Sequence, residues 1–180
     1  MAAPSLFSGY TGLLPSAYLA SMAETWLLPS AIVIVTIVGM EALAAAVHRH
    51  VMHGRGWGWH RSHHEPRQGL FEKNDLYALL FAGLSLLCFI LLPALWPPLW
   101  WVGVGTLLYG LLYTILHDGL VHRRLPFLPS PRRGYLKRLV QAHRLHHAVR
   151  ERSGAVSFGF LYAPPVKRLR RDLRERREGR

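Results

Sequence analysis

Apolar residues are concentrated in three runs of the chain, each long enough to cross a bilayer as a helix. The runs are 28–47, 76–96 and 99–116, and Glu41 is the only charged residue in them. A helix rises about 1.5 Å per residue, so about twenty residues span a hydrocarbon core of roughly 30 Å. The pattern therefore predicts an all-α integral membrane protein with three transmembrane helices.

Prolines divide the apolar region between residues 76 and 116, which would otherwise read as one helix too long for any bilayer. We expect a hairpin of two spans with a short uncharged turn near Pro97. Residues 1–28 are only weakly apolar and lack the basic start of a cleaved signal peptide. They are predicted to form a re-entrant or surface segment, with a fourth transmembrane helix as the alternative.

The basic residues are separated from these runs. The net charge is +12, yet all 22 Lys and Arg lie at or after Arg49 and none lies in the two later runs. Because loops rich in Lys and Arg stay on the cytoplasmic side, the loop 48–75 and the tail 117–180 are predicted to face the cytoplasm. The turn near Pro97 and the N-terminus then lie outside.

Length and composition favour one membrane domain over residues 1–180, because the chain is not comfortably long enough for two. The single cysteine, Cys88, lies in an apolar run, so no disulfide can form within the chain. Residues 164–180 form a basic amphipathic tail. This tail either lies on anionic lipid headgroups or is a solvated charged segment.

Ten of the eleven histidines follow one spacing pattern that occurs twice. In each copy an H-x4-H pair placed just after a span precedes an H-x2-H-H trio, at an interval of six residues in the first copy and twenty in the second. A lone histidine is more often an ordinary surface or core residue than a ligand, but four clusters in register indicate a metal centre. Only His50 lies off the spacing; the ten are His48, His53, His60, His63, His64, His117, His122, His143, His146 and His147.

Helix geometry predicts how these motifs present their rings. On a helix that turns about 100° per residue, each trio lies within about 100° of arc, and its adjacent histidines can reach two different metals. The two members of an H-x4-H pair lie about 140° apart, so they cannot share a metal on an ideal helix. We expect each pair to straddle the site, or the helix to be distorted by fraying where it leaves the membrane.

The number of imidazoles bears on the metal, since imidazole suits zinc, copper, iron and nickel. A zinc site takes at most about four protein ligands, so ten histidines are too many for one zinc and unusual for two. Two six-coordinate irons would offer roughly twelve positions, which leaves about two for oxygen or water. This count favours two non-haem iron ions that activate dioxygen, held in a cytoplasmic histidine-rich cap.

Two acidic residues are candidates to support the ligands. Asp118 directly follows His117 and can accept a hydrogen bond that fixes the tautomer of an imidazole, or it can cap a helix or form a salt bridge to Arg123 or Arg124. Glu41 lies seven residues before His48, on the same helix face and inside the membrane. A carboxyl there is a functional candidate, or a neutral group that serves only helix packing.

Longer motifs surround the histidines between about Ile32 and Leu173. They are HRHVMHG (48–54), WHRSHHEP (59–66), NDLYA (74–78), YGLLY (109–113), HDGLVH (117–122), KRLVQAHRLHHAV (137–149) and SFGFLYAPP (157–165). These motifs resemble the bacterial β-carotene hydroxylases, within the membrane fatty acid hydroxylase and sterol desaturase superfamily. His50 departs from the pattern, which has an aromatic or apolar residue at that position.

The resemblance implies an activity: hydroxylation of C3 of the β-ionone rings, which turns β-carotene into zeaxanthin by way of cryptoxanthin. It also implies dioxygen as oxidant, a ferredoxin as electron donor, and the ten matched histidines as catalytic iron ligands at the inner membrane. The carotenoid would come laterally from the bilayer, and Trp59, Tyr109 and Tyr113 are candidates to line its path. No nucleic-acid partner is expected.

Two other interpretations remain open at this stage. A fatty acid or sterol hydroxylase, a desaturase or a carotenoid ketolase would carry the same histidine spacing. A metal transporter would need polar residues along the spans, where Glu41 is the only charge.

The electrons must come from another protein, because the chain has no glycine-rich strand–turn–helix to hold a flavin or nicotinamide. Basic residues close to the ligands, Arg132 and Arg133 among them, would attract an acidic ferredoxin. The alternative is that these arginines only enforce topology and bind anionic lipid.

Overall fold

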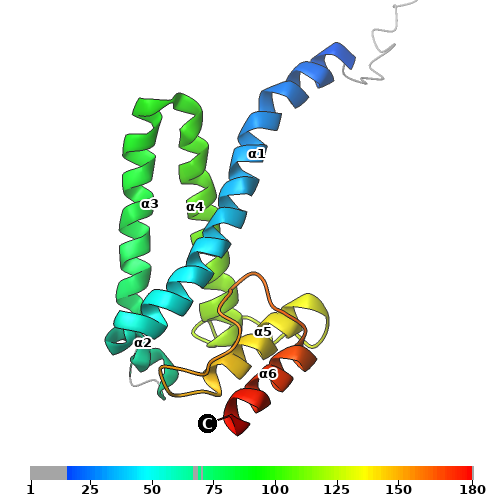
Figure 1. Cartoon of the computed structure of the whole chain (residues 1–180). Coiled ribbons are helices and arrows are strands. Elements are labelled where there is room, and N and C mark those ends of the chain that lie inside the picture. The colour runs from blue at the N-terminus through cyan, green and yellow to red at the C-terminus, as the bar shows by residue number, and fades with distance from the viewer. Residues whose placement is uncertain (1–15, 67–68, 70, 180) are drawn as a thin grey trace, which may run out of the picture.

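A computed structural model describes residues 16–66, 69 and 71–179, and every regular element in them is helical (Figure 1). The prediction of an all-α fold is confirmed for this part of the chain. The elements are α1 (Ser16–Val47), η1 (His48–Arg55), α2 (Trp57–His64), α3 (Asp75–Leu95), η2 (Pro97–Leu99), α4 (Trp100–Tyr113), η3 (Thr114–Val121), α5 (Gly134–His147) and α6 (Val166–Glu178). Of these, η1 and η3 are π-helices and η2 is a single 3-10 turn.

Three helical stretches are long and apolar enough to cross a membrane, and they coincide closely with the three predicted runs. They are Thr25–Arg55, Asp75–Leu95 and Pro97–Val121. Their side chains are mostly exposed on the protein surface, as lipid-facing residues must be. The predicted hairpin is also present, because α3 and α4 lie side by side and are joined by η2 (Figure 1).

The first helix begins earlier than the sequence predicted. Residues 16–28 continue α1 through Pro29 and do not form a separate re-entrant or surface segment. A proline removes only one backbone hydrogen bond, and membrane helices tolerate that loss. Three candidate spans are therefore found in the described residues, and residues 1–15, on which the alternative of a fourth span partly rests, lie outside them.

The histidine-bearing segments gather at one end of the molecule. In Figure 1 the turn between α3 and α4 lies at the top, and α2, α5 and α6 form a cap at the bottom. Between these ends α1 packs closely on α4, where a Cβ atom on Gly105 would lie 2.6 Å from Cβ of Thr36. Small residues permit such close helix packing in a membrane. The loop 48–75 and the tail 117–180 thus share one end, as the charge pattern requires.

The cap has its own hydrophobic core, to which α5, the loop 148–163 and α6 contribute. From α6, Leu169 and Leu173 are 3% and 7% exposed and pack on this core. The apolar side of the predicted amphipathic tail is therefore occupied by the protein itself. Only the arginine-rich side of α6 remains for headgroups or solvent.

Reporter fusions test the predicted orientation. Fusions after residue 60 and at the C-terminus should both report the cytoplasm, and a fusion near Pro97 should report the outside, because Lys and Arg are retained on the cytoplasmic side. A cytoplasmic signal from the fusion near Pro97 would contradict the hairpin topology.

Candidate metal centre

Each H-x4-H pair lies where a membrane-spanning helix widens into a π-helix. At the end of η3, the backbone N–H of His122 donates a hydrogen bond to the carbonyl of His117 at 3.0 Å. Residues five apart are joined in this way in a π-helix. The wider turn brings residues five apart to one face. The helix is distorted here, but as a π-helix and not by fraying, and the members of a pair do not straddle the site, so neither alternative given for the pairs is correct.

The ten patterned histidines meet in two groups. In the first, called the His60 group, the ring nitrogens lie within 4.8 Å of one another; its members are His48, His53, His60, His64 and His146. The second, called the His63 group, meets the same criterion with His63, His122, His143 and His147. His117 adjoins the second group, since its Nε2 lies 3.1 Å from Nε2 of His63.

The two trios divide between the groups in opposite ways. From α2, His60 and His64 belong to the His60 group and His63 to the other, whereas α5 makes the reverse division. Adjacent histidines therefore do reach two different sites, as the helical arc predicted. The His60 group combines one H-x4-H pair, two histidines from one trio and one from the other, and the His63 group together with the adjoining His117 has the same composition.

Hydrogen bonds identify the protonated nitrogen of each ring in the His60 group. Every Nδ1 lies beside an oxygen that can only accept, so Nδ1 carries the proton. The acceptors are the carbonyls of Phe158 (2.9 Å, to His48), Arg152 (2.8 Å, to His53), Val149 (2.8 Å, to His64) and Val156 (2.9 Å, to His146), and the amide oxygen of Asn74 (2.7 Å, to His60).

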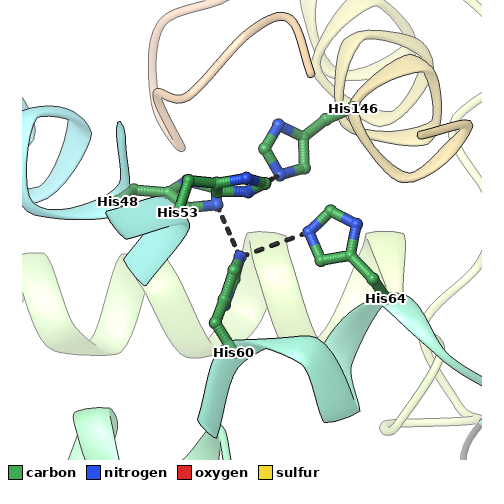
Figure 2. Close-up of side chains that lie close together, drawn as sticks. All are labelled: His48, His53, His60, His64 and His146. Carbon is green, nitrogen blue, oxygen red and sulfur yellow. Dashed lines mark hydrogen bonds between the residues drawn. The ribbon is translucent and has the colours of Figure 1, made fainter. Parts of the chain in front are cut away.

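The opposite nitrogens, Nε2, point toward the middle of the group (Figure 2). Nε2 of His60 lies 3.1 Å from Nε2 of His48 and 3.2 Å from Nε2 of His64. Because the proton of each ring is on Nδ1, these approaches bring lone pairs together and cannot be hydrogen bonds in the neutral state. A shared cation accounts for such an arrangement.

Burial keeps the cap histidines neutral. It lowers the pKa of His60 to about 3 and that of His64 to about 4, because a charged ring would lose its hydration. For the same reason the pKa of His147 falls to about 2, and the pKa of His143 lies well below its usual range. Neutral imidazole is the form that binds metal, so the donor set fits two metal ions, one in each group.

The His63 group has acidic neighbours. Asp118 lies beside His117, with its Oδ1 2.7 Å from Nδ1 of that ring. Glu72 makes the matching contact, with Oε2 3.0 Å from Nδ1 of His63. Sequence reasoning missed both Glu72 and Asn74 as partners of ligand rings, because no helical spacing links the segment before α3 to the trio on α2.

Glu41 forms hydrogen bonds with the backbone of the loop 157–163 and does not contact a histidine ring. One of its oxygens accepts the backbone N–H groups of Phe160 and Tyr162, each at 2.9 Å, and the other accepts the hydroxyl of Tyr109 at 3.0 Å. Phe160 in turn stacks on His48, with ring centroids 5.2 Å apart. Glu41 thus joins α1, α4 and the loop 157–163 directly beside the metal centre.

An apolar cavity of 610 Å³ is lined by side chains of all three spans and by Phe160, whose ring stacks on His48. Tyr109, Tyr113 and Phe160 line it, so two of the three candidate aromatic residues are placed there. Trp59 is half-exposed and packs edge-on against Tyr77 instead. Small-molecule sites typically enclose about 300–1,000 Å³, so the cavity can hold an organic ligand.

The chain matches one protein-family model and several proteins of known name. Residues 33–164 match the family model described as fatty acid hydroxylase. The chain is 60% identical to the beta-carotene hydroxylase of Pantoea ananas over 84% of its own length and 86% of the relative, and 57% identical to that of Paracoccus sp. (strain PC1) over 79% and 89%. It is 39% identical to beta-carotene 3-hydroxylase 1, chloroplastic, of Arabidopsis thaliana over 71% of this chain and 42% of the relative. No solved structure matches the chain closely enough for comparison.

Alanine substitution tests the assignment of ligands. Replacing any of the ten patterned histidines with alanine should cause loss of bound metal and of the activity that depends on it, because each ring belongs to one of the two groups or, for His117, adjoins the second. His50 is exposed and belongs to neither group, so His50→Ala should keep both. Metal content per purified chain is the measurement, and metal loss in His50→Ala equal to that in His60→Ala would contradict the assignment.

Proposed function

The chain belongs to the fatty acid hydroxylase family, and we propose that it is a β-carotene 3-hydroxylase. In this proposal the enzyme hydroxylates C3 of each β-ionone ring of β-carotene and so produces zeaxanthin. It uses two non-haem iron ions, dioxygen and electrons from a ferredoxin. The site faces the cytoplasm from a bacterial inner membrane. The most similar relatives described above, which carry the name beta-carotene hydroxylase, support this substrate.

The observation that carries the proposal is that two aromatic side chains lining the apolar cavity stack directly on patterned histidines. Tyr113 lines the cavity and stacks on His117, with ring centroids 4.5 Å apart and an angle of 24°. Phe160 also lines the cavity and stacks on His48 at 13°. A ring held at this end of the cavity is therefore separated from each group by a single layer of aromatic side chains.

The protein and its metal ions would divide the work. An unactivated C–H bond offers nothing for an ordinary side chain to attack, so the irons, when bound, would supply the oxidising chemistry. The His60 group would hold one ion and the His63 group the other. The chain's own task is to hold a rigid apolar polyene so that one ring carbon faces the metal centre.

Side chains around the cavity suit that task. Its lining is largely apolar and comes from all three spans, so a carotenoid dissolved in the bilayer would not lose hydrogen bonds on binding. Glu41 fixes Phe160 through the backbone of the loop, and a Cβ on Gly159 would lie 2.6 Å from the same carboxylate. The close contact between the backbone at Gly159 and the Glu41 carboxylate thus holds Phe160 between the cavity and the histidines.

Expression in cells that make β-carotene tests the function directly. Pigment chromatography should show cryptoxanthin and then zeaxanthin, and His60→Ala should leave β-carotene unchanged. Keto-carotenoids would instead indicate a ketolase, and altered fatty acids or sterols with unchanged pigment would indicate another member of the family. Metal uptake by vesicles without oxygen consumption would support a transporter.

A cavity-filling variant in the same cells links this activity to the cavity. Gly110 lines the cavity and has no atom within 4 Å of an added Cβ, so Gly110→Phe should fill it. A phenyl ring there would occupy the space proposed for the substrate, and a loss of about 1.4 kcal/mol in binding is a factor of ten, so we expect product to fall about tenfold or more, with metal retained. The matched control is Gly83→Phe, at an equally open position on α3 outside the cavity, which should behave as wild type.

Charge reversal tests the electron donor. Arg132 and Arg133 are exposed on the cap, just before α5, and can steer an acidic ferredoxin. Replacing both with glutamate should slow turnover driven by ferredoxin but not turnover driven by a small chemical reductant, and high salt should weaken the defect. Equal loss with both reductants would indicate damage to the fold or the metal site, and no loss would remove these arginines from the docking surface.

A further inference from the structure

The two histidine groups differ in the charge of the atoms that their outer nitrogens contact. We propose that they form inequivalent metal sites, in which the His63 group holds its cation more tightly than the His60 group does. This inference rests on the proposed function, because it assumes that each group binds a metal ion. It assigns Glu72, Asp118 and Arg124 as residues that position and tune one site only.

The His60 group is backed entirely by neutral oxygens. Each of its five Nδ1 atoms contacts either a backbone carbonyl or the amide oxygen of Asn74. Four of these five acceptors come from one segment, residues 149–158, which packs under the rings as part of the cap core. Such partners orient the imidazoles and fix their tautomers, but they add no net charge.

The His63 group and the adjoining His117 are backed by two carboxylates in poorly hydrated positions. The side chain of Glu72, whose Oε2 contacts His63, is only 9% exposed, and that of Asp118, which contacts His117, is 22% exposed. A carboxylate that accepts a hydrogen bond from Nδ1 raises the basicity of the ring and strengthens its metal bond through Nε2. Partial burial strengthens the attraction between the carboxylates and a cation.

A third carboxylate and one arginine complete this surround. Arg124 lies 3.2 Å from Oε1 of Glu72, 2.8 Å from Oδ1 of Asp75 and 4.0 Å from Oδ2 of Asp118. It therefore holds the two histidine-contacting carboxylates in place from the side away from the rings. Three carboxylates and one guanidinium leave an excess of negative charge beside the His63 group. The Nδ1 partners of the His60 group carry no charge.

The expected size of the difference follows from the usual effect of such outer partners. Their loss typically costs about 10–100-fold in metal affinity. Two carboxylates on one group and none on the other should therefore separate the two affinities by about tenfold or more. The more weakly held ion, in the His60 group, would be the first to leave and the last to load.

Stepwise removal of cobalt from the purified full chain tests the inference. The protein in detergent micelles is stripped with a chelator, reloaded with Co²⁺ alone, and equilibrated against graded chelator while metal per chain and visible absorption are recorded. The wild-type chain should retain one cobalt ion at chelator concentrations that remove the second ion. Glu72→Gln keeps a hydrogen-bond acceptor but removes the charge, so it should weaken the tighter equivalent about tenfold or more and leave the weaker one unchanged.

Asn74→Asp is the matched control, because it adds a carboxylate to the His60 group at the same type of contact and should tighten the weaker equivalent. Asp118→Asn keeps the inference testable if Glu72→Gln fails to fold, and it should weaken the same equivalent as Glu72→Gln. The inference would be overturned if the two cobalt ions left the wild-type chain together, or if Glu72→Gln weakened the binding of both ions equally. Either result would leave the proposed function standing. A wild-type chain that binds no cobalt would contradict the proposed function itself.

Discussion

Five unprotonated imidazole nitrogens directed at one point repel one another, and the rest of the cap is organised around holding them there. Their Nδ1 atoms all contact carbonyl or amide oxygens. Burial keeps the rings of His60 and His64 neutral, so these two cannot relieve the repulsion by taking up a proton at neutral pH. A cation at the centre converts this unfavourable arrangement into a favourable one. Metal binding and the packing of the cap are therefore coupled.

The supporting structure is mostly backbone, which explains why the cap looks irregular. Two π-helices turn each H-x4-H pair toward the centre, and the segment 149–158 presents its carbonyls to four rings of the His60 group. Helix α6 supports this segment and the residue before it, since the guanidinium groups of Arg176 and Arg177 donate to the carbonyls of Ala155 and Ala148. The arginine-rich tail thus has a structural role in addition to any contact with lipid or partner proteins.

Much of this arrangement could be predicted from the sequence, because its strongest signals are periodic. Long apolar runs can only be helices in a bilayer, and the repeated histidine motifs identified every member of the two groups and the division of each trio between them. The start of α1 was missed because its first residues are only weakly apolar. The π-helices were missed because five-residue spacing was judged against an ideal α-helix.

Other features leave no local signature. A backbone carbonyl that fixes a histidine tautomer can belong to any residue type, so Val149 or Phe158 could not be identified from composition. Glu72 and Glu41 contact their partners through tertiary structure. Glu72 contacts His63, nine residues before it, and Glu41 accepts a hydrogen bond from the backbone of Phe160. The asymmetry between the two groups therefore becomes visible only in three dimensions.

X-ray absorption at the iron edge, combined with elemental analysis of the purified full-length protein, tests the central claim most directly. Two irons per chain, each surrounded by nitrogen and oxygen with the outer scattering of several imidazole rings, is the result that this account predicts. A single zinc per chain, with full activity in the absence of iron, would contradict it.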